Sequence, residues 1–249
     1  MRALLGSAAD LVLPRTCGGC GAVGAVLCVR CERLLSGEAR PVVPRPVPDG
    51  WPPCWAGGSY EGAAAAALRA FKDGDRRDLA PWLARCLAVA VDSALAGEPA
   101  AARAATTGRL AVVPVPSARR TTRRRGDRPV VQIAQAALAG LHQNEAPIVE
   151  ALSLSRGVVD QAGLDAVARR ANLAAAMQVR PAGLRRVRGS VCLVVDDVVT
   201  SGSTVAEASR ALQAAGAAGV VAAAALATPR RSGLVDPYPE VAPATKLSS

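Results

Sequence analysis

The sequence predicts an α/β protein in which helices flank a parallel β-sheet, with a small cysteine-rich module at the amino-terminal end. Three observations lead to this fold class. Short apolar runs, typical of strands buried on both faces, recur at residues 110–113, 191–195 and 220–226. Alanine-rich segments of helical length separate these runs. Four cysteines in two Cys-x-x-Cys pairs precede all of them.

The length of 249 residues allows one large domain with a sizeable core and one small domain. Aromatic residues make up only 2% of the chain, which favours a tightly packed α/β core over an aromatic-rich binding surface. No apolar run is long enough to cross a bilayer, so we expect no membrane span. Asp10 interrupts the first apolar stretch and Pro14 follows it, which argues against a secretory signal. We therefore expect a cytoplasmic protein.

The two cysteine pairs have the spacing of a structural zinc site. Cys17 and Cys20 form the first pair, Cys28 and Cys31 form the second, and seven residues separate the pairs. Four thiolates at this spacing can close a tetrahedral shell around Zn²⁺ and leave no open coordination position. The alternatives are redox-active or free cysteines, or disulfides, which would need an oxidising compartment. We predict structural zinc.

A proline-rich stretch at residues 40–53 predicts a stiff connector after the cysteine module. The chain then divides into a zinc-binding module with its connector at residues 1–55, a second domain at 56–230 and a flexible tail at 231–249. Trp51, Trp55 and Tyr60 are expected to pack against the zinc module. The remaining cysteines are expected to be small core residues: Cys54, Cys86 and Cys192.

The second domain begins with two expected helices, at residues 62–71 and 79–95, and a small-residue linker at 97–108. After the strand at 110–113 we expect a helix at 131–141, a strand at 148–152, a mobile polar segment at 153–165 and a helix at 166–177. The strand at 191–195 and the helix at 206–215 come next, and the strand at 220–226 ends the fold.

An arginine-rich loop follows the strand at residues 110–113. The net charge of the chain is +10, and much of it lies in six closely spaced arginines: Arg119, Arg120, Arg123, Arg124, Arg125 and Arg128. Loops at strand ends often carry function, and such a cluster suits a polyanion, either a pyrophosphate or a nucleic acid. The alternative is a solvated run of charge.

The stretch at residues 191–204 is the most specific signal in the chain. Its apolar run stops at Asp196 and Asp197, and a loop of hydroxyls with one glycine comes before the helix: Thr200, Ser201, Gly202, Ser203 and Thr204. Unsatisfied backbone N–H groups at a helix start favour an anion, so this loop suits a phosphate. Adjacent carboxylates at a strand end suit the hydroxyls of a polyol or a bound Mg²⁺. Phosphate beside a diol describes ribose 5-phosphate.

This stretch resembles the phosphoribosyl-pyrophosphate signature of the type I phosphoribosyltransferases. The resemblance implies their fold for residues 56–230. It also implies that Asp196 and Asp197 hold the ribose hydroxyls with Mg²⁺ nearby, and that residues 200–204 hold the 5′-phosphate. The pyrophosphate would fall to the arginine loop: Arg119, Arg120, Arg123, Arg124 and Arg125.

With the cysteine pairs and the Val-Pro-Val-Pro segment at residues 113–116 added, the chain resembles the ComF family from about residue 11 to 227. These are competence-associated, phosphoribosyltransferase-like proteins with an amino-terminal zinc module. Further matches to the family pattern are Arg125-Gly126, Gln161, Gly163, Leu164, Arg169 and Asn172, and Lys72-Asp73-Gly74 approximates its Lys-x-x-Gly turn. Residues 127–129 depart from it, because Asp-Arg-Pro stands where members commonly have Phe-Asn-Gln.

Two functions follow from the resemblance. The first is a Mg²⁺-dependent transferase that uses phosphoribosyl pyrophosphate and an unknown nitrogen acceptor. The second is a non-catalytic protein that handles single-stranded DNA during uptake, together with DNA-uptake proteins. No catalytic residue is assigned, because His142 is the only histidine and is expected at the surface. Thr200 stands where the 6-oxopurine enzymes of the superfamily usually carry an aspartate, which argues against hypoxanthine or guanine.

Overall fold

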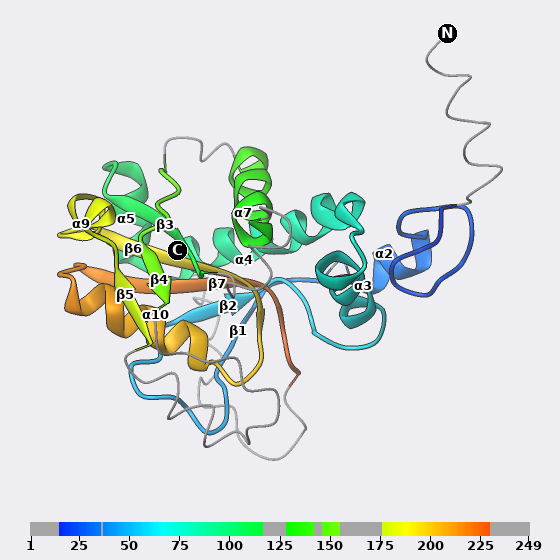
Figure 1. Ribbon diagram of the computed structural model, residues 1–249, viewed down its shortest axis with the longest axis horizontal. Coiled ribbons are helices and arrows are strands. Elements are labelled where there is room, and N and C mark those ends of the chain that lie inside the picture. Colours follow the sequence, from blue (N-terminus) through cyan, green and yellow to red (C-terminus); the bar gives the residue numbers. More distant parts are fainter. Residues whose placement is uncertain (1–14, 36, 117–127, 142–145, 155–175, 230–249) are drawn as a thin grey trace, which may run out of the picture.

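The computed structural model (Figure 1) describes residues 15–35, 37–116, 128–141, 146–154 and 176–229. Most of the mobile segment expected at 153–165, most of the helix expected at 166–177, His142 and the whole tail expected at 231–249 lie outside these residues. The helices and strands of the described residues, in chain order, are α2 (Val29–Leu35), β1 (Arg40–Pro41), β2 (Cys54–Ala56), α3 (Gly62–Asp73), the 3₁₀ turn η1 (Arg77–Leu79), α4 (Ala80–Gly97), α5 (Pro99–Thr106), β3 (Leu110–Pro114), α7 (Pro129–Gly140), β4 (Leu152–Leu154), β5 (Met177–Val179), α9 (Pro181–Val187), β6 (Val191–Val199), α10 (Ser203–Ala214) and β7 (Gly219–Ala227). The described ends of the expected mobile segment and of the helix expected at 166–177 are strand: Ser153 and Leu154 belong to β4, and Met177 begins β5.

A five-stranded sheet in the order β1-β2-β7-β6-β3 forms the centre of the protein. The strands β2, β7, β6 and β3 run parallel, and β1 closes one edge in the antiparallel sense. Every residue of β3 is buried, and so are most residues of β6 and β7. This is the burial that near-continuous apolar runs predict for parallel strands covered on both faces. The predicted α/β fold class is confirmed.

Helices cover both faces of the sheet. In Figure 1, α4, α5 and α7 lie on one side of it and α10 lies on the other. The helix α4 packs against β7, β2 and α7, and α10 packs against β6 and β7. Alanine fills most of β7, which lets α4 approach closely. At the end of β2 the approach is closer still, because a Cβ on Gly57 would lie 1.9 Å from the carbonyl oxygen of Cys86.

A second, two-stranded sheet joins β4 and β5 in the antiparallel sense. A buried carboxylate ties it to α10, since Glu207 accepts a hydrogen bond from the backbone N–H of Met177 at 2.9 Å. Arg210 donates both to that carboxylate and to the carbonyl of Met177. The helix that follows the hydroxyl-rich loop is therefore anchored at one side by β5.

The segment expected to be a linker at residues 97–108 is instead a helix, α5, and that expectation is wrong. Pro99 occupies its first turn and Glu98 before it is extended, an arrangement that favours helix initiation. Ala101 and Ala104 are buried, so the small residues that suggested a linker in fact allow close packing. The strand expected at 148–152 is also displaced, because β4 begins at Leu152 and Ile148 only bridges to Val112 of β3.

The proline-rich connector ends within the sheet. Its two ends form β1 and β2, and Cys54 of β2 pairs with Ala222 of β7. The boundary predicted between residues 55 and 56 thus falls inside a strand; the three-part division itself stays a prediction. Trp55 does not reach the cysteine module as expected: it packs on Gly97 at the end of α4, where a Cβ would lie 2.6 Å from Cζ2 of the indole.

Within the described residues one helical stretch, Arg77–Gly97, is long and apolar enough to span a membrane by length and composition alone, although no run of that kind was expected from the sequence. Its apolar window is 56% buried within the protein. The contacts of α4 with β7 and α7 are those of a core helix, which accounts for the apolar composition.

Candidate functional site

The hydroxyl-rich loop connects β6 to α10 at the carboxyl end of the parallel strands. The helix begins at Ser203, three residues earlier than expected, so Ser203 and Thr204 belong to its first turn. Gly202 stands at the cap position and offers no side chain to the free N–H groups behind it. Ser201 and Ser203 have their hydroxyl oxygens 3.1 Å apart. A helix start capped only by glycine, with hydroxyls beside it, is suited to a phosphate group.

Gly202 is required here for two reasons. Its φ of +78° is left-handed, and a Cβ on it would lie 2.6 Å from Pro44 Cγ and 2.6 Å from Trp51 Cζ3. The indole of Trp51 therefore packs on the loop, not on the cysteine module as expected. The sequence held only a weak signal for this contact, since Trp51 lies in the proline-rich stretch expected to be a connector.

The two carboxylates lie inside β6 and not after its end, because the strand continues to Val199. Adjacent residues of a strand point to opposite faces, so Asp196 and Asp197 face different surroundings. Both are buried, with exposed fractions of 7% and 4%. Asp196 accepts a hydrogen bond from the backbone N–H of Asp197 at 2.8 Å. The two acids are therefore not equivalent, although the sequence presents them as a pair.

Burial is the main cause that raises the pKa of Asp196 well above its usual value, and the charge of Asp197 raises it further. Lys72 opposes this increase only in part. Asp196 in turn raises the pKa of the buried thiol of Cys54, after burial itself, so that thiol is no nucleophile. Of the two carboxyl groups, Asp197 has a cationic partner in direct contact.

That partner is Lys72, in the last turn of α3. Its Nζ lies 2.7 Å from Oδ1 of Asp197, across 125 positions of sequence. The side chain of Lys72 is 36% exposed, whereas that of Asp197 is 6% exposed. The buried carboxylate of Asp197 is thus paired with an ammonium group that remains partly accessible to solvent. Lys72 is one of only two lysines in the chain and stands in the Lys72-Asp73-Gly74 turn, but its role here could not be read from the sequence.

The five arginines proposed for pyrophosphate, Arg119, Arg120, Arg123, Arg124 and Arg125, lie outside the described residues. The described residues on either side of them line a cavity of ≈ 120 Å³ at the end of β3, which Pro114 and Pro116 border. One water needs roughly 10–15 Å³ in this measure, so the cavity has room for a small ligand group. Arg128 and Arg180 also line it, and Arg128 pairs with Glu150.

The cavity is close to the acid pair in the sheet. Pro114 is in register with Val195 of β6, and the N–H of Val115 donates to the carbonyl of Val195 at 3.0 Å. Pro114 and Val195 are the last pair in the register of β3 and β6, so Asp196 and Asp197 come directly after the level at which β3 ends and the cavity begins. Arg128 and Arg180 thus stand at the same edge of the sheet as the carboxylates.

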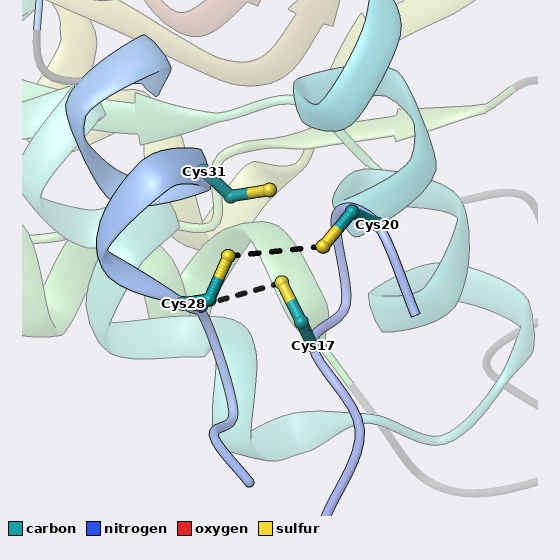
Figure 2. A group of neighbouring side chains, drawn as sticks. All are labelled: Cys17, Cys20, Cys28 and Cys31. Atoms are coloured by element: carbon teal, nitrogen blue, oxygen red, sulfur yellow. Dashed lines mark hydrogen bonds between the residues drawn. The ribbon is translucent and has the colours of Figure 1, made fainter. Parts of the chain in front are cut away.

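The four cysteines come together as expected (Figure 2). The sulfur atoms of Cys17, Cys20, Cys28 and Cys31 all lie within 4.8 Å of one another. Cys20 and Cys28 have their sulfurs 3.7 Å apart. In a tetrahedral site with Zn–S bonds of about 2.3 Å, ligand sulfurs are roughly 3.8 Å apart. The cluster therefore has the donor set and the dimensions to hold a zinc ion.

The surroundings of these sulfurs also suit a metal. Burial acts to raise the pKa of Cys17, but N–H groups of Cys28, Cys20 and Gly19 donate toward its sulfur and lower the pKa to about 6. The donor from Cys28 lies 3.3 Å from that sulfur. Burial raises the pKa of Cys31 to about 12, helped by its neighbouring thiols. Backbone N–H donors to sulfur stabilise a thiolate, the form that binds zinc.

The module is packed onto α3. A Cβ on Gly19 would lie 2.9 Å from the sulfur of Cys31 and 3.0 Å from Cβ of Ala63, in the first turn of α3. Gly18 packs in the same way on Leu79 of η1. At the surface, Arg85 and Glu32 form an ion pair of 2.5 Å between α4 and α2. The cysteine module is thus seated on the helix that carries Lys72.

Comparison with known families gives one match. Residues 132–242 match the model of the phosphoribosyl transferase domain. No curated protein matches the chain. The matched region contains Asp196, Asp197 and residues 200–204, and it excludes β3, Lys72 and the cysteine module. The match supports a function that uses phosphoribosyl pyrophosphate, and it agrees with the predicted fold, a parallel sheet flanked by helices with a four-cysteine cluster before it.

Proposed function

We propose that this protein is a ComF-like phosphoribosyltransferase-domain protein that binds phosphoribosyl pyrophosphate with Mg²⁺. One observation carries the proposal: a glycine-capped helix start lies directly after two buried carboxylates at the carboxyl end of a parallel sheet. Ligands of open α/β sheets bind at this edge. The phosphoribosyl transferase domain match over residues 132–242 supports the same ligand.

The loop residues Thr200 to Thr204 would bind the 5′-phosphate through backbone N–H groups and hydroxyls. Asp197 and Asp196 would accept hydrogen bonds from the ribose hydroxyls, and Mg²⁺ would supply positive charge for the pyrophosphate. Arg128 and Arg180, which line the cavity at the end of β3, join Arg119, Arg120, Arg123, Arg124 and Arg125 as candidates for pyrophosphate contacts.

Transfer to a nitrogen acceptor would form a bond from the nitrogen to C1′ of the ribose. The bond from C1′ to the pyrophosphate oxygen breaks, and the pyrophosphate leaves with its electron pair. The proton lost from the nitrogen passes to solvent. Such a reaction depends on positioning and on neutralising the leaving charge, so it needs few reactive side chains. The proposal therefore has two parts: binding of phosphoribosyl pyrophosphate, which is the ligand half, and transfer to an acceptor, which is the catalytic half.

We also propose that Cys17, Cys20, Cys28 and Cys31 bind one structural zinc ion. Four protein thiolates complete a tetrahedral shell, so this zinc would have no position for substrate. Its chemistry would be to hold the amino-terminal module in shape against α3.

Calorimetry with the full chain tests the ligand half. Mg²⁺–phosphoribosyl pyrophosphate should bind more tightly than ribose 5-phosphate, because only the former also reaches the pyrophosphate groups. Ribose, which lacks the phosphate, is the matched control and should not bind. If well-folded protein with Mg²⁺ binds neither phosphorylated compound, the proposal is wrong. Release of pyrophosphate in the presence of ammonia or nucleobases then tests the catalytic half.

A second candidate is a single-stranded DNA-handling protein that acts with DNA-uptake proteins. The dense arginines at residues 119–128 favour it. If they contact DNA phosphates, affinity should fall with salt at a log–log slope of about −0.7 per phosphate. Replacing Arg119, Arg120 and Arg123 with alanine should then flatten the slope by about two. Salt-steep binding that ignores Mg²⁺–phosphoribosyl pyrophosphate would favour this candidate over the first.

A further inference from the structure

The loop between β1 and β2 runs over the proposed phosphate-binding loop. Trp51 and Pro44 both stand where a Cβ of Gly202 would be, at 2.6 Å. Gly50 lies against the next turn, since a Cβ on it would be 3.9 Å from the carbonyl oxygen of Ala206 in α10. Residues 44–51 therefore cover both the glycine cap and the start of the helix.

This cover is tied to the central sheet. The indole N–H of Trp51 donates to the carbonyl of Val42 at 3.2 Å, and the N–H of Val42 donates to the carbonyl of Cys54 at 2.8 Å. Cys54 belongs to β2, which pairs with β7. Trp51 is half-buried, with one end of its ring system on Gly202 and the other hydrogen-bonded to backbone. These hydrogen bonds hold the indole of Trp51 in a fixed position relative to the central sheet.

We propose that Trp51 is a positioning residue for the phosphate-binding loop. Hydrogen bonds between Ser201 and Ser203 connect the residues on either side of Gly202. Gly202 itself has no side chain and a left-handed φ of +78°, so its backbone can adopt other conformations unless a neighbouring group restricts it. The indole restricts the peptide from one side, and the N–H groups behind it then keep a fixed direction toward the phosphate. Held donors bind an anion more tightly than donors that must be ordered on binding.

The inference rests on the proposed function, because it concerns the same phosphate group. It predicts that the loss of Trp51 affects the binding of some ligands and not of others. Removing Trp51 should weaken the binding of ligands that carry the 5′-phosphate. It should leave unchanged the binding of inorganic pyrophosphate with Mg²⁺, because the proposed pyrophosphate contacts are Mg²⁺ and the arginines at the end of β3.

The test compares Trp51→Leu and Trp51→Phe with Trp55→Leu in the full chain. Trp55 is the matched control: it is a half-buried tryptophan four residues away that lies in β2 and packs on Gly97 at the end of α4. Trp51→Leu should weaken ribose 5-phosphate binding about tenfold, because loop N–H groups that the indole no longer holds must be ordered when the ligand binds. Trp51→Phe keeps an aromatic ring against Gly202, so its affinity for ribose 5-phosphate should lie between those of the wild type and Trp51→Leu. If the leucine variant does not fold, the phenylalanine variant still provides the test.

Indole fluorescence provides a readout that a merely structural role would not move. Ribose 5-phosphate should change the emission of the wild type and of Trp55→Leu but not that of Trp51→Phe. Equal loss of affinity in the Trp51 and Trp55 variants, or loss of pyrophosphate binding along with ribose 5-phosphate, would overturn the inference and leave the proposed function standing. A wild type that binds no ribose 5-phosphate would overturn both.

Discussion

Short sequence motifs mark both the cysteine module and the proposed ribose-phosphate site. The residues of the first are close along the chain, whereas those of the second are far apart. All four sulfurs come from residues 17–31, and they lie within 4.8 Å of one another. The second site adds to its motif Lys72, which is 125 positions from Asp197, and Trp51 from the loop between β1 and β2. The cysteine motif thus contains every residue of its site, whereas the motif at residues 191–204 contains only some of the residues that meet at the second site.

The largest expected effect is on the self-contained module. Cys20 is exposed, so Cys20→Ser removes a ligand without disturbing the core. Zinc in such modules contributes an apparent binding free energy of about 10–16 kcal/mol that is also folding free energy. We expect the variant to lose one equivalent of zinc and residues 17–35 to lose protection from hydrogen exchange. Elemental analysis and exchange mass spectrometry measure both.

The same experiment shows how self-contained the module is. Because Gly19 packs on Ala63, exchange should also rise in the first turn of α3, while β6 and β7 stay protected. Cys192→Ala, at a buried cysteine of β6, should keep its zinc. Cleanly purified wild type without stoichiometric metal would contradict the zinc assignment.

The second largest effect is expected on stability when Gly202 is changed, because Gly202 in the hydroxyl-rich loop contacts residues distant in sequence. Gly202→Ala places a methyl group 2.6 Å from Trp51 and Pro44 and forces a left-handed φ on alanine. We expect a loss of roughly 2–4 kcal/mol in the free energy of unfolding, from overpacking together with backbone strain. Denaturant unfolding measures it.

Gly108→Ala is the matched control for this change. Gly108 has a φ of +66° but no atom within 4 Å of a Cβ, so alanine there meets only the backbone penalty, about 1 kcal/mol. If the two variants lose equal stability, the contact between the loop and Trp51 contributes nothing, and the dependence on distant residues is weaker than described.

A smaller effect should separate the two carboxylates. Asp197→Asn removes the charged acceptor, and hydrogen bonds to charged groups are worth on the order of 1.5–3 kcal/mol, so affinity for Mg²⁺–phosphoribosyl pyrophosphate should fall at least tenfold. Asp196→Asn should cost less near neutral pH. Burial raises the pKa of Asp196, so its neutral form persists to higher pH, and asparagine resembles that form.

Calorimetry at two pH values checks this difference. As pH rises through the raised pKa, Asp196 gains its charge, so the loss caused by Asp196→Asn should grow with pH. Equal losses for the two variants at every pH would show that the acids act as an equivalent pair.

The smallest effect is expected at Lys72. Its side chain is 36% exposed, so the pair with Asp197 should contribute less than about 1 kcal/mol to stability. Lys72→Gln should raise the affinity of Asp197 for Mg²⁺ alone a few-fold, since the ammonium no longer competes for the carboxylate. Titration with Mn²⁺ by electron paramagnetic resonance measures this, with Lys72→Arg as the charge-preserving control. Unchanged or weaker metal binding in Lys72→Gln would place the metal elsewhere.

The strands expected at residues 110–113, 191–195 and 220–226 agree with the structure because they depend only on residues that are adjacent in the sequence. The apolar runs predicted β3, β6 and β7 because a strand buried on both faces must be apolar throughout. The expectations that failed depended on packing. Alanine and glycine at residues 97–108 suit either a linker or a tightly packed helix, and it is the packing against α4 and the sheet that favours the helix α5. The proline-rich stretch likewise joins the sheet through distant partners: Arg40 and Pro41 pair with β2, and the carbonyl of Pro53 accepts a hydrogen bond from the N–H of Ala222 in β7.

By itself, the sequence determined the parallel sheet, the four-cysteine cluster and the glycine-capped loop after the acid pair, since each depends on residues close along the chain. Only the tertiary structure decided that Asp196 and Asp197 have different surroundings, that Lys72 pairs with Asp197, and that Trp51 packs on the hydroxyl-rich loop and not on the cysteine module. The physical reason is the same in each case. Spacing along a strand or helix follows from backbone geometry, whereas contacts between distant segments depend on how the whole core packs.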